Sequence, residues 1–404
     1  MGIVVQKYGG TSLADQSRLH QVAERVARLY KEGNQCVVIV SAMGKTTDKL
    51  VHLSHQITKS PGQREMDMLL TTGEQVSVAL LTMALQEKGL PAYPMTGWQA
   101  GIQTNHIHGA ARIEAIHSKR IQKHLYKEEI VVVAGFQGIS PTGEITTLGR
   151  GGSDTTAVSL AAALAAERCE IYTDVDGVYT SDPRVVPKAQ KLKEISYGEM
   201  LELANLGAGV LHPRAVECAM SHQVPLVVRS SFTDEPGTLV KGELKMEKVV
   251  VRGVVYDEPV ARIKVLGLKG EINALPRLFG LLAEAQINVD IIVQSEHEEE
   301  RINVSFTVEE RECKRALQVI AQEKDQLQYI DLAYETGLAK VSCVGAGMVS
   351  NPGVAAKMFR TLVEEGIRIK MVSTSEIKIS CIIHKDLAIK AVRALHTAFG
   401  LDHL

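Results

Sequence analysis

The sequence lacks the cysteine spacings on which metal sites and disulfide frameworks depend. Its six cysteines stand singly along 404 residues, and no CxxC pair occurs. Neither a zinc site nor a domain held by disulfides is therefore expected, and no metal ligand is predicted. The cysteines are Cys36, Cys169, Cys218, Cys313, Cys343 and Cys381.

An excess of charge of one sign is also missing. The 45 lysines and arginines are balanced by 47 aspartates and glutamates, which leaves a net charge of −2. No basic run or basic–aromatic stripe stands out, so nucleic acid is not expected as a partner.

Long hydrophobic runs are absent as well. No apolar run reaches the length that a membrane span needs, so no membrane partner is expected. Residues 2–6 indicate a first strand rather than a signal peptide. The chain is therefore predicted to be a cytoplasmic enzyme or regulator.

The composition is that of an ordinary globular protein, long enough for two or three domains. Up to about residue 230, apolar strands alternate with helical patterns, which favours an α/β fold with a mostly parallel sheet between helices. Ligands of such folds bind at the carboxyl ends of the strands. A polar stretch followed by alternating charges places the end of this domain at residue 245. The expected strands are 3–6, 36–41, 130–134, 170–173 and 225–228, and the expected helices include 17–30, 66–87 and 157–166.

The rest of the chain contains an internal repeat. Residues 261–267 match 339–345, and residues 285–294 match 365–374 after a slightly longer loop in the second copy. Each copy then adds a strand and a helix, giving the order strand–helix–strand–strand–helix that is typical of ferredoxin-like domains. Two such domains are predicted, at 246–335 and 336–404. The added strands are 302–308 and 377–383, and the added helices are 316–322 and 388–399.

The most informative motif is residues 147–154, in which three glycines surround Arg150 and lead to Asp154. A helix-forming Ala/Leu-rich segment follows directly. A glycine-rich turn that opens a helix directs free backbone N–H groups and the helix dipole toward an anion. Arg150 could hold a carboxylate with two parallel hydrogen bonds, and Asp154 could hold an ammonium group or a cationic residue. The simpler alternative is that Ser153 or Asp154 only caps the helix.

A second motif, residues 7–12, lies at the end of the first expected strand. Its glycines allow the backbone to approach a phosphate closely, and Lys7 could neutralise a phosphoryl group in transfer. Taken alone, a surface lysine beside a glycine turn is the simpler interpretation. Farther along, Asp174 and Asp176 could bind Mg²⁺ or a ribose, or could belong to an ordinary Asp-Gly turn. That segment by itself favours neither interpretation.

Six motifs together give the chain a strong resemblance to the aspartate kinases of the amino-acid kinase family. The resemblance covers essentially the whole sequence, and the C-terminal repeat resembles the tandem ACT domains of the same enzymes. No homoserine dehydrogenase portion follows, so the resemblance is to the monofunctional form. The motifs are residues 7–12, 41–48, 71–75, 147–157, 172–184 and 211–215.

The resemblance implies transfer of a phosphoryl group from ATP to the β-carboxylate of L-aspartate, a reaction that depends on positioning and charge neutralisation. Lys7 would contact the phosphoryl group, Asp154 would orient Lys7 or the amino group, and Arg150 would hold a substrate carboxylate. Glu74 would receive the ammonium end, with Thr47, Gly151, Gly152 and Ser153 around the substrate. Nucleotide contacts would come from Lys7, Tyr8, Gly9, Gly10, Thr173, Asp174, Tyr179, Thr180, Ser181, Asp182, Pro183 and Arg184. Mg²⁺ would be held largely by phosphate oxygens and water.

One position departs from the family pattern. Many relatives carry a lysine where this chain has Gly209. A cation near the nucleotide phosphates would then be missing, and Arg184 or Arg214 is expected to substitute for it.

The ACT resemblance implies feedback control. The reaction, which yields 4-phospho-L-aspartate, would be the first step toward lysine, threonine and methionine. Lysine is the expected inhibitor, and lysine together with threonine is the second choice. The first copy lacks the Pro-Gly found at residues 352–353, so the two copies could differ in effector binding. Effector contacts are expected at Asn288, Val289, Asp290 and Gln294, and at Val354, Ala355, Arg368, Ile369 and Ser375.

The assembly is expected to be a homo-oligomer, or an α2β2 assembly whose regulatory subunit starts internally near Met246. An ordinary linker methionine is the alternative there. Two rival functions remain: a kinase for another amino acid or carbamate on the same fold, and a silent amino-acid sensor that uses only its ACT domains. Arg150 with Glu74 favours a substrate bearing both a carboxylate and an ammonium group, and an intact Lys7 argues against the sensor.

Overall fold

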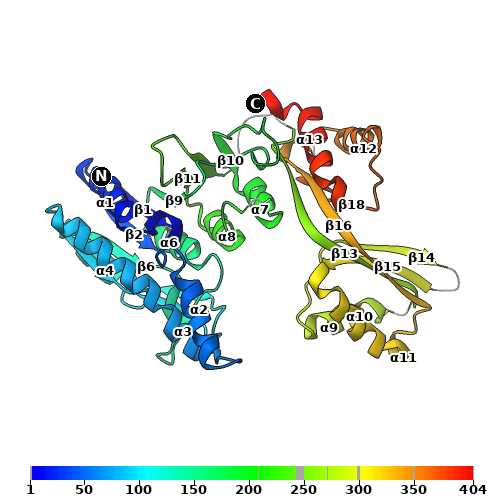
Figure 1. Ribbon diagram of the computed structural model, residues 1–404, viewed down its shortest axis with the longest axis horizontal. Coiled ribbons are helices and arrows are strands. Elements are labelled where there is room, and N and C mark those ends of the chain that lie inside the picture. The colour runs from blue at the N-terminus through cyan, green and yellow to red at the C-terminus, as the bar shows by residue number, and fades with distance from the viewer. Residues whose placement is uncertain are drawn as a thin grey trace. The chain divides into compact units, whose positions relative to one another are not determined.

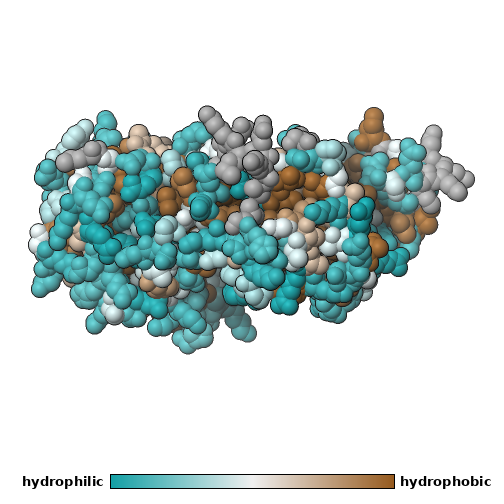
Figure 2. Space-filling view, turned by 90° about the horizontal axis from the view of Figure 1, so that it is seen from above, coloured by the Kyte–Doolittle hydropathy of each residue, from teal (hydrophilic) through white to brown (hydrophobic). Residues whose placement is uncertain are grey.

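The computed structural model describes residues 2–207, 209–242, 250–270, 272–297, 301–348 and 351–403. These residues form two compact units. The first contains residues 2–179 and 191–242, and the second contains residues 180–190 and 250–403. The domain boundary predicted at residue 245 lies outside the described residues. The face drawn in Figure 2 is largely hydrophilic, with smaller hydrophobic patches.

An eight-stranded sheet organises the first unit. Its neighbouring strands pair in parallel except for β11 with β12, which confirms the predicted mostly parallel sheet. The sheet is buried on both faces, as in β6, where every residue is buried, and this is why its strands are continuous apolar runs. In sheet order the strands are β10 (Glu194–Ser196), β12 (Thr238–Lys241), β11 (Leu226–Ser230), β9 (Arg168–Thr173), β1 (Ile3–Tyr8), β2 (Gln35–Val40), β6 (Ile130–Ala134) and β3 (Ala92–Met95).

Helices cover both faces of this sheet (Figure 1). Because side chains alternate along a strand, Val4 and Tyr8 join a core with α1 and α4, while Lys7 faces α6 on the other side. The helix α6 packs against α8 and contacts β1 and β9. The helices are α1 (Gln16–Lys31), α2 (Thr46–Ile57), α3 (Gln63–Leu70), α4 (Thr72–Glu87), α5 (Lys119–Leu125), α6 (Gly152–Ala163), α7 (Tyr197–Asn205) and α8 (Pro213–His222), with a 3₁₀ turn, η1 (Gly10–Leu13).

A small four-stranded sheet lies alongside. It carries the last strand before the glycine-rich turn, so it fixes where that turn begins. Its strands in order are β5 (Ile113–Ile116), β4 (Ile102–Thr104), β7 (Gln137–Ile139) and β8 (Ile145–Thr147).

The single helix predicted at 66–87 is wrong in detail, because it is divided at Thr71 into α3 and α4. The expectation of no membrane-length apolar segment also needs correction. By length and composition alone, Gln63–Glu87 is apolar enough to cross a membrane. Half of its most apolar window is buried inside the protein, which is how the core helix of a globular domain behaves, so this is weak evidence for a span.

The second unit confirms the predicted repeat. Each copy has the order strand–helix–strand–strand–helix, and the two copies form one six-stranded sheet. Two long antiparallel strands run through both copies, with α9 and α10 beside one end and α12 and α13 beside the other (Figure 1). In sheet order the strands are β14 (Ile292–His297), β15 (Arg301–Glu309), β13 (Gly253–Lys269), β16 (Asp331–Val344), β18 (Lys378–His384) and β17 (Met371–Thr374). The helices are α9 (Ala274–Glu284), α10 (Cys313–Gln322), α11 (Lys324–Leu327), α12 (Val354–Glu364) and α13 (Ala388–Ala398), with 3₁₀ turns η2 (Glu310–Glu312), η3 (Ala346–Met348), η4 (Lys385–Leu387) and η5 (Leu401–His403).

Residues 180–190 belong to this second unit, although they lie between β9 and β10 of the first unit in the sequence. Val186 is buried in the core that α12 and α13 form. Nearby, the Thr180 hydroxyl lies 2.8 Å from His396 Nε2, and His396 Nδ1 lies 2.7 Å from Asp402 Oδ1. His396 is fully buried, so this polar chain anchors the segment in the second copy of the repeat.

Replacing Asp402 should show how much this anchor contributes. Asp402→Ala leaves the buried His396 without its acceptor, so we expect the free energy of unfolding to fall by about 1–3 kcal/mol. Urea denaturation measures the change. Asp386→Ala, which removes an exposed carboxylate paired with His384, is the control and should change stability by less than about 0.5 kcal/mol. Equal losses for the two variants would contradict the anchor.

Candidate active site

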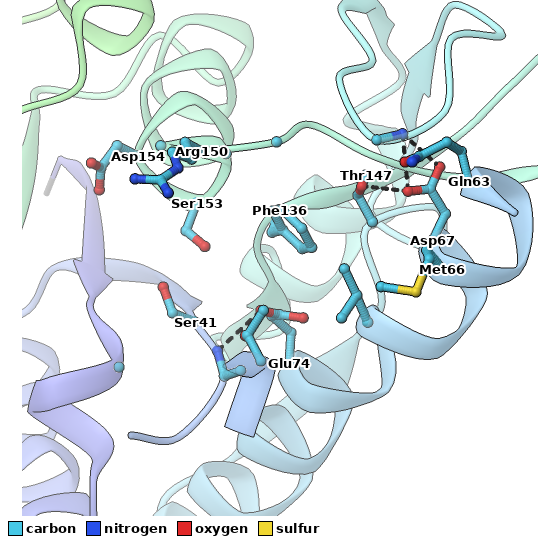
Figure 3. Close-up of a pocket in the computed structure, with 18 of the residues that line it drawn as sticks. Ser41, Gln63, Met66, Asp67, Glu74, Phe136, Thr147, Arg150, Ser153 and Asp154 are labelled. Atoms are coloured by element: carbon cyan, nitrogen blue, oxygen red, sulfur yellow. Dashed lines mark hydrogen bonds between the residues drawn. The ribbon is translucent and has the colours of Figure 1, made fainter. Parts of the chain in front are cut away.

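A cavity of about 910 Å³ opens in the first unit where β1, β2 and β6 end. This is the edge at which ligands of parallel α/β sheets bind. Most of the predicted catalytic and substrate residues meet there, and Figure 3 shows Arg150, Ser153 and Asp154 on one side and Glu74 on another. The predicted residues that line the cavity are Lys7, Gly10, Thr47, Glu74, Arg150, Gly151, Gly152, Ser153 and Asp154.

The glycine-rich turn folds as the sequence indicates, and α6 begins inside it. Gly149 and Gly151 have φ values of +73° and +68°, a left-handed conformation that glycine adopts without steric strain. At Gly151 a Cβ would lie 2.1 Å from His212 Cγ, so no side chain fits. The tight turn therefore places the N-terminal end of α6, with its positive dipole end, at the cavity.

Lys7 and Asp154 form an ion pair across the cavity edge. Lys7 Nζ lies 2.6 Å from Asp154 Oδ1, and the two side chains are only 12% and 14% exposed. One residue comes from the end of β1 and the other from the first turn of α6. The pair keeps an ammonium group at the cavity and holds it in one place.

Arg150 presents a guanidinium to the same cavity. Its side chain is exposed, and among the described residues it makes no hydrogen bond or ion pair. A planar guanidinium with unused N–H groups is suited to a carboxylate. The alternative in which this motif only caps a helix does not explain a cavity lined by Arg150, Lys7 and Asp154.

Glu74 supplies a buried carboxylate on the opposite wall. It is 3% exposed; Oε1 accepts a hydrogen bond from the Ala42 N–H at 3.1 Å, while Oε2 has no partner among the described residues. Burial raises the pKa of Glu74 to about 7. A buried carboxylate oxygen without a donor is suited to receive a cationic group from a ligand.

Among the cavity residues that were not predicted, Phe136 and Asp67 are the most informative. Phe136 follows β6 and has a φ of +69°, which is strained for an aromatic residue and is typical of functional sites. Asp67 is fully buried on α3. The sequence offers one indication of its importance: Asp67 is a single aspartate between Met66 and Met68, in a segment that is otherwise predicted to be an apolar helix.

Comparison with known proteins agrees with this geometry. Residues 2–230 match the amino acid kinase family, and residues 263–323 and 341–399 match the ACT domain. The aspartokinase of Geobacillus stearothermophilus is 57% identical over 402 residues, which cover 99% of this chain and 98% of that protein. Aspartokinase 2 of Bacillus subtilis is 54% identical over 403 residues, covering 100% of this chain and 98% of that protein.

The chain belongs to the aspartokinases of the amino acid kinase family.

Solved structures support the same conclusion. The structure of Escherichia coli aspartokinase III in complex with aspartate and ADP has a TM-score of 0.83 and 27% identity, and covers 98% of this chain and 99% of that chain. A second structure of that enzyme, with lysine and aspartate, has a TM-score of 0.77 and 28% identity over the same shares. The chain thus has the activity of an aspartate kinase and belongs to a family of nucleotide-using enzymes.

The predicted nucleotide residues of this aspartokinase lie in different places. Lys7 and Gly10 line the cavity, and Gly9 directly precedes Gly10. The Tyr8 ring, in contrast, is buried in the core, where it stacks on Tyr172. The Thr173 hydroxyl donates a hydrogen bond to the carboxylate of Asp174, which is exposed. Thr180, Ser181, Asp182, Pro183 and Arg184 fall in the second unit.

The contacts of Asp176 favour its role in an Asp-Gly turn over the binding of Mg²⁺ or a ribose. Tyr179 donates to one of its oxygens at 2.9 Å, and Lys191 Nζ lies 3.1 Å from the other. Partial burial alone would raise the pKa of Asp176, but these hydrogen bonds outweigh it and hold the pKa below its usual value. The carboxylate therefore closes the turn at the base of the 180–190 segment.

Gly209 has a φ of +65°, and a Cβ there would lie 3.8 Å from the Gly207 carbonyl oxygen, an ordinary van der Waals contact. Of the two expected substitutes for the family lysine, Arg214 already donates to the carbonyls of Leu148 at 2.6 Å and Ala111 at 3.0 Å. Arg184 pairs with Asp182 at 2.8 Å within the second unit. The replacement of the missing cation stays a prediction.

The predicted effector segments of the two copies meet on one face of the second unit. Ile291, next to Asp290, and Met371, two residues after Ile369, pack in one small apolar cluster with Leu338. Asp290 also pairs with Lys340 of β16. Because Ala339 and Val341 point into the core of α12 and α13, Leu338 and Lys340 lie on the face without helices. Asn288 and Arg368 are exposed, Ser375 follows β17 and Gln294 lies in β14. The remaining predicted residues pack on the helix side of the sheet: Val289 against the core of α9 and α10, and Val354, Ala355 and Ile369 in the core of α12 and α13.

Glu74 should make aspartate binding depend on pH. Only its ionised form pairs with an ammonium group, and with a pKa of about 7 the ionised fraction rises about tenfold between pH 6 and pH 8. We therefore expect KM for aspartate to fall about tenfold over that range, while KM for MgATP changes little. Steady-state kinetics at each pH measure both constants.

Glu74→Gln should raise KM for aspartate and remove its dependence on pH in this range. Glu87→Gln, an exposed change on the same helix, should keep the dependence of the unchanged protein. A pH profile that survives in Glu74→Gln would show that another group is responsible.

Proposed function

We propose that the chain transfers the γ-phosphoryl group of ATP to the β-carboxylate of L-aspartate and releases 4-phospho-L-aspartate. The observation that carries this proposal is the combination, in one cavity, of the Arg150 guanidinium and the buried Oε2 of Glu74, neither of which has a partner in the part of the chain that the structure describes. An amino acid presents one carboxylate and one ammonium group to such a pair. The E. coli structure with aspartate and ADP supports the assignment by relationship.

The catalytic residues act by placing charges. Arg150 holds one substrate carboxylate and Glu74 receives the ammonium group, which leaves the second carboxylate as the nucleophile. Lys7, fixed by Asp154, neutralises charge on the phosphoryl group as it passes between the two substrates. Thr47, Gly151, Gly152 and Ser153 surround the substrate from the cavity walls.

Mg²⁺ would enter as part of the nucleotide complex. Within the ranges that the structure describes, no group of three or more His, Cys, Asp or Glu residues is arranged to hold a metal ion. Asp154, a carboxylate at the phosphoryl end of the cavity, is paired with Lys7. These residues fit a cation whose ligands are mainly phosphate oxygens and water, which neutralises phosphate charge when bound.

The rival functions fit the cavity less well. Carbamate has no ammonium group and would leave the buried Glu74 oxygen without a partner, at a considerable desolvation cost. A sensor that uses only its ACT domains would have no use for the Lys7–Asp154 pair and the cavity around it.

Regulation by an end product is the second part of the proposal. We propose feedback inhibition by lysine, or by lysine with threonine, on the helix-free face where the segments of Asp290 and Ile369 meet. The E. coli enzyme whose structure contains lysine as well as aspartate supports this choice by relationship. The reaction would then open the synthesis of lysine, threonine and methionine in the cytoplasm.

The assembly also remains a proposal. A homo-oligomer, or an α2β2 assembly with a regulatory subunit started near Met246, would suit an ACT pair with an exposed sheet face. Met246 itself lies outside the described residues. Purified native enzyme that showed no fragment of the C-terminal half would argue against the internal start.

Lys7→Ala should reduce kcat by at least about 10²-fold, because it removes the cation that faces the transferring phosphoryl group. Effector binding, which uses the second unit, should survive and can be followed by calorimetry. Lys127→Ala, an exposed lysine of the first unit, is the control and should keep full activity. Near-normal turnover in Lys7→Ala would show that its assigned role is wrong.

An assay of ADP release with MgATP and L-aspartate, with and without lysine, threonine or both, tests the reaction and its control together. We expect aspartate-dependent turnover that lysine suppresses. Turnover indifferent to both amino acids would keep the kinase and remove the proposed feedback. No aspartate-dependent turnover would overturn the proposed reaction and direct attention to Gly209.

A further inference from the structure

Asp67 is a buried charge that the reaction described above does not use. It is the one buried residue among the eight of α3, its exposed fraction is 0%, and it lines the cavity. A carboxylate in such a place is costly unless donors surround it, so the groups around it are held firmly.

Four contacts surround this carboxylate. The Thr147 hydroxyl donates to Oδ1 at 2.5 Å, and the Gly109 N–H lies 3.1 Å from each oxygen. His108 Nδ1 lies 2.7 Å from Oδ2. Figure 3 shows Asp67 and Thr147 joined at one end of the cavity.

These contacts join two backbone segments beside the glycine-rich turn. The Ala111 N–H donates to the Thr147 carbonyl at 2.9 Å, so the segment that carries His108 and Gly109 runs against the end of β8. A Cβ at Gly149 would lie 3.0 Å from the Gly109 carbonyl oxygen, which shows how closely the two segments approach. On the far side, Arg214 donates to the carbonyls of Leu148 and Ala111 and closes the same pair of segments.

Arg150 follows directly on Leu148 and Gly149. Since its guanidinium has no partner among the described residues, the position of that group depends on the backbone that carries it. The backbone in turn is fixed by Asp67 on one side and Arg214 on the other. We propose that Asp67 is a positioning residue, which sets the affinity for aspartate by holding Thr147 and Gly109, and through them the turn that carries Arg150. The proposal rests on the role of Arg150 proposed above.

Asp67→Asn keeps the shape of the side chain but replaces one acceptor oxygen with an NH2 group. That NH2 group would face the donors that now surround the carboxylate. We expect KM for aspartate to rise at least about tenfold, because small displacements of a binding group have large effects. We expect KM for MgATP to stay within about twofold and kcat to change less than KM for aspartate. A merely structural role would lower the active fraction or shift both KM values together, and that result would overturn the proposal.

Thr147→Val removes one donor without touching the charge and serves if Asp67→Asn folds poorly. It should raise KM for aspartate in the same direction by a smaller factor. Glu65→Gln, an exposed change on the same helix, is the matched control and should leave both KM values unchanged. If Thr147→Val behaved like Glu65→Gln, the assigned contact would not matter and the proposal would fall.

A double-mutant cycle separates this proposal from the one on which it rests. Arg150→Ala alone should raise KM for aspartate, and adding Asp67→Asn to it should have little further effect, because the positioned group is already gone. If Arg150→Ala left KM unchanged, the role of Arg150 in the proposed function would be wrong. If Asp67→Asn raised KM by the same factor with and without Arg150, Asp67 would act independently and the positioning role would be refuted.

Discussion

The ion pair between Lys7 and Asp154 is the interaction on which the rest of the catalytic unit depends. It joins the end of β1, which pairs with β2 on one side and β9 on the other, to the first turn of α6. A nearly buried ammonium group needs an anion close to it, and the N-terminal end of a helix favours that anion. One contact therefore fixes the end of β1 relative to the glycine-rich turn that carries Arg150.

The rest of the cavity keeps groups that the protein itself leaves without partners. Glu74 is buried with one oxygen unpaired, and Arg150 projects without a protein partner among the described residues. Burial desolvates the Glu74 carboxylate and raises its pKa to about 7. A desolvated carboxylate costs stability, which is the usual relation between stability and a functional site. Elsewhere in the cavity wall, buried polar groups such as the Asp67 carboxylate have hydrogen-bond partners, which hold the surrounding backbone in place.

The two copies in the second unit share one six-stranded sheet. Residues 253–257 of β13 pair with residues 340–344 of β16, so each long strand takes part in both copies. The 180–190 segment is anchored in the core of the second copy through Thr180, His396 and Asp402, while Tyr179 and Lys191 at its base belong to the first unit. The chain itself thus ties a segment with a predicted nucleotide role to the core of the second copy.

The sequence by itself determined the parallel α/β unit, the repeat of two ferredoxin-like copies and the residues of the two glycine-rich motifs. Those depend on local periodicity, on glycine where the backbone turns left-handed, and on motif order, all of which can be read along the chain. The break between α3 and α4, the strained Phe136 and the buried Asp67 could not be read this way, because each depends on neighbours far away in sequence. Only the tertiary structure placed residues 180–190 with the second unit, left one oxygen of Glu74 without a partner among the described residues and set Asp67 against Thr147. Burial and partner choice are decided when distant segments pack together.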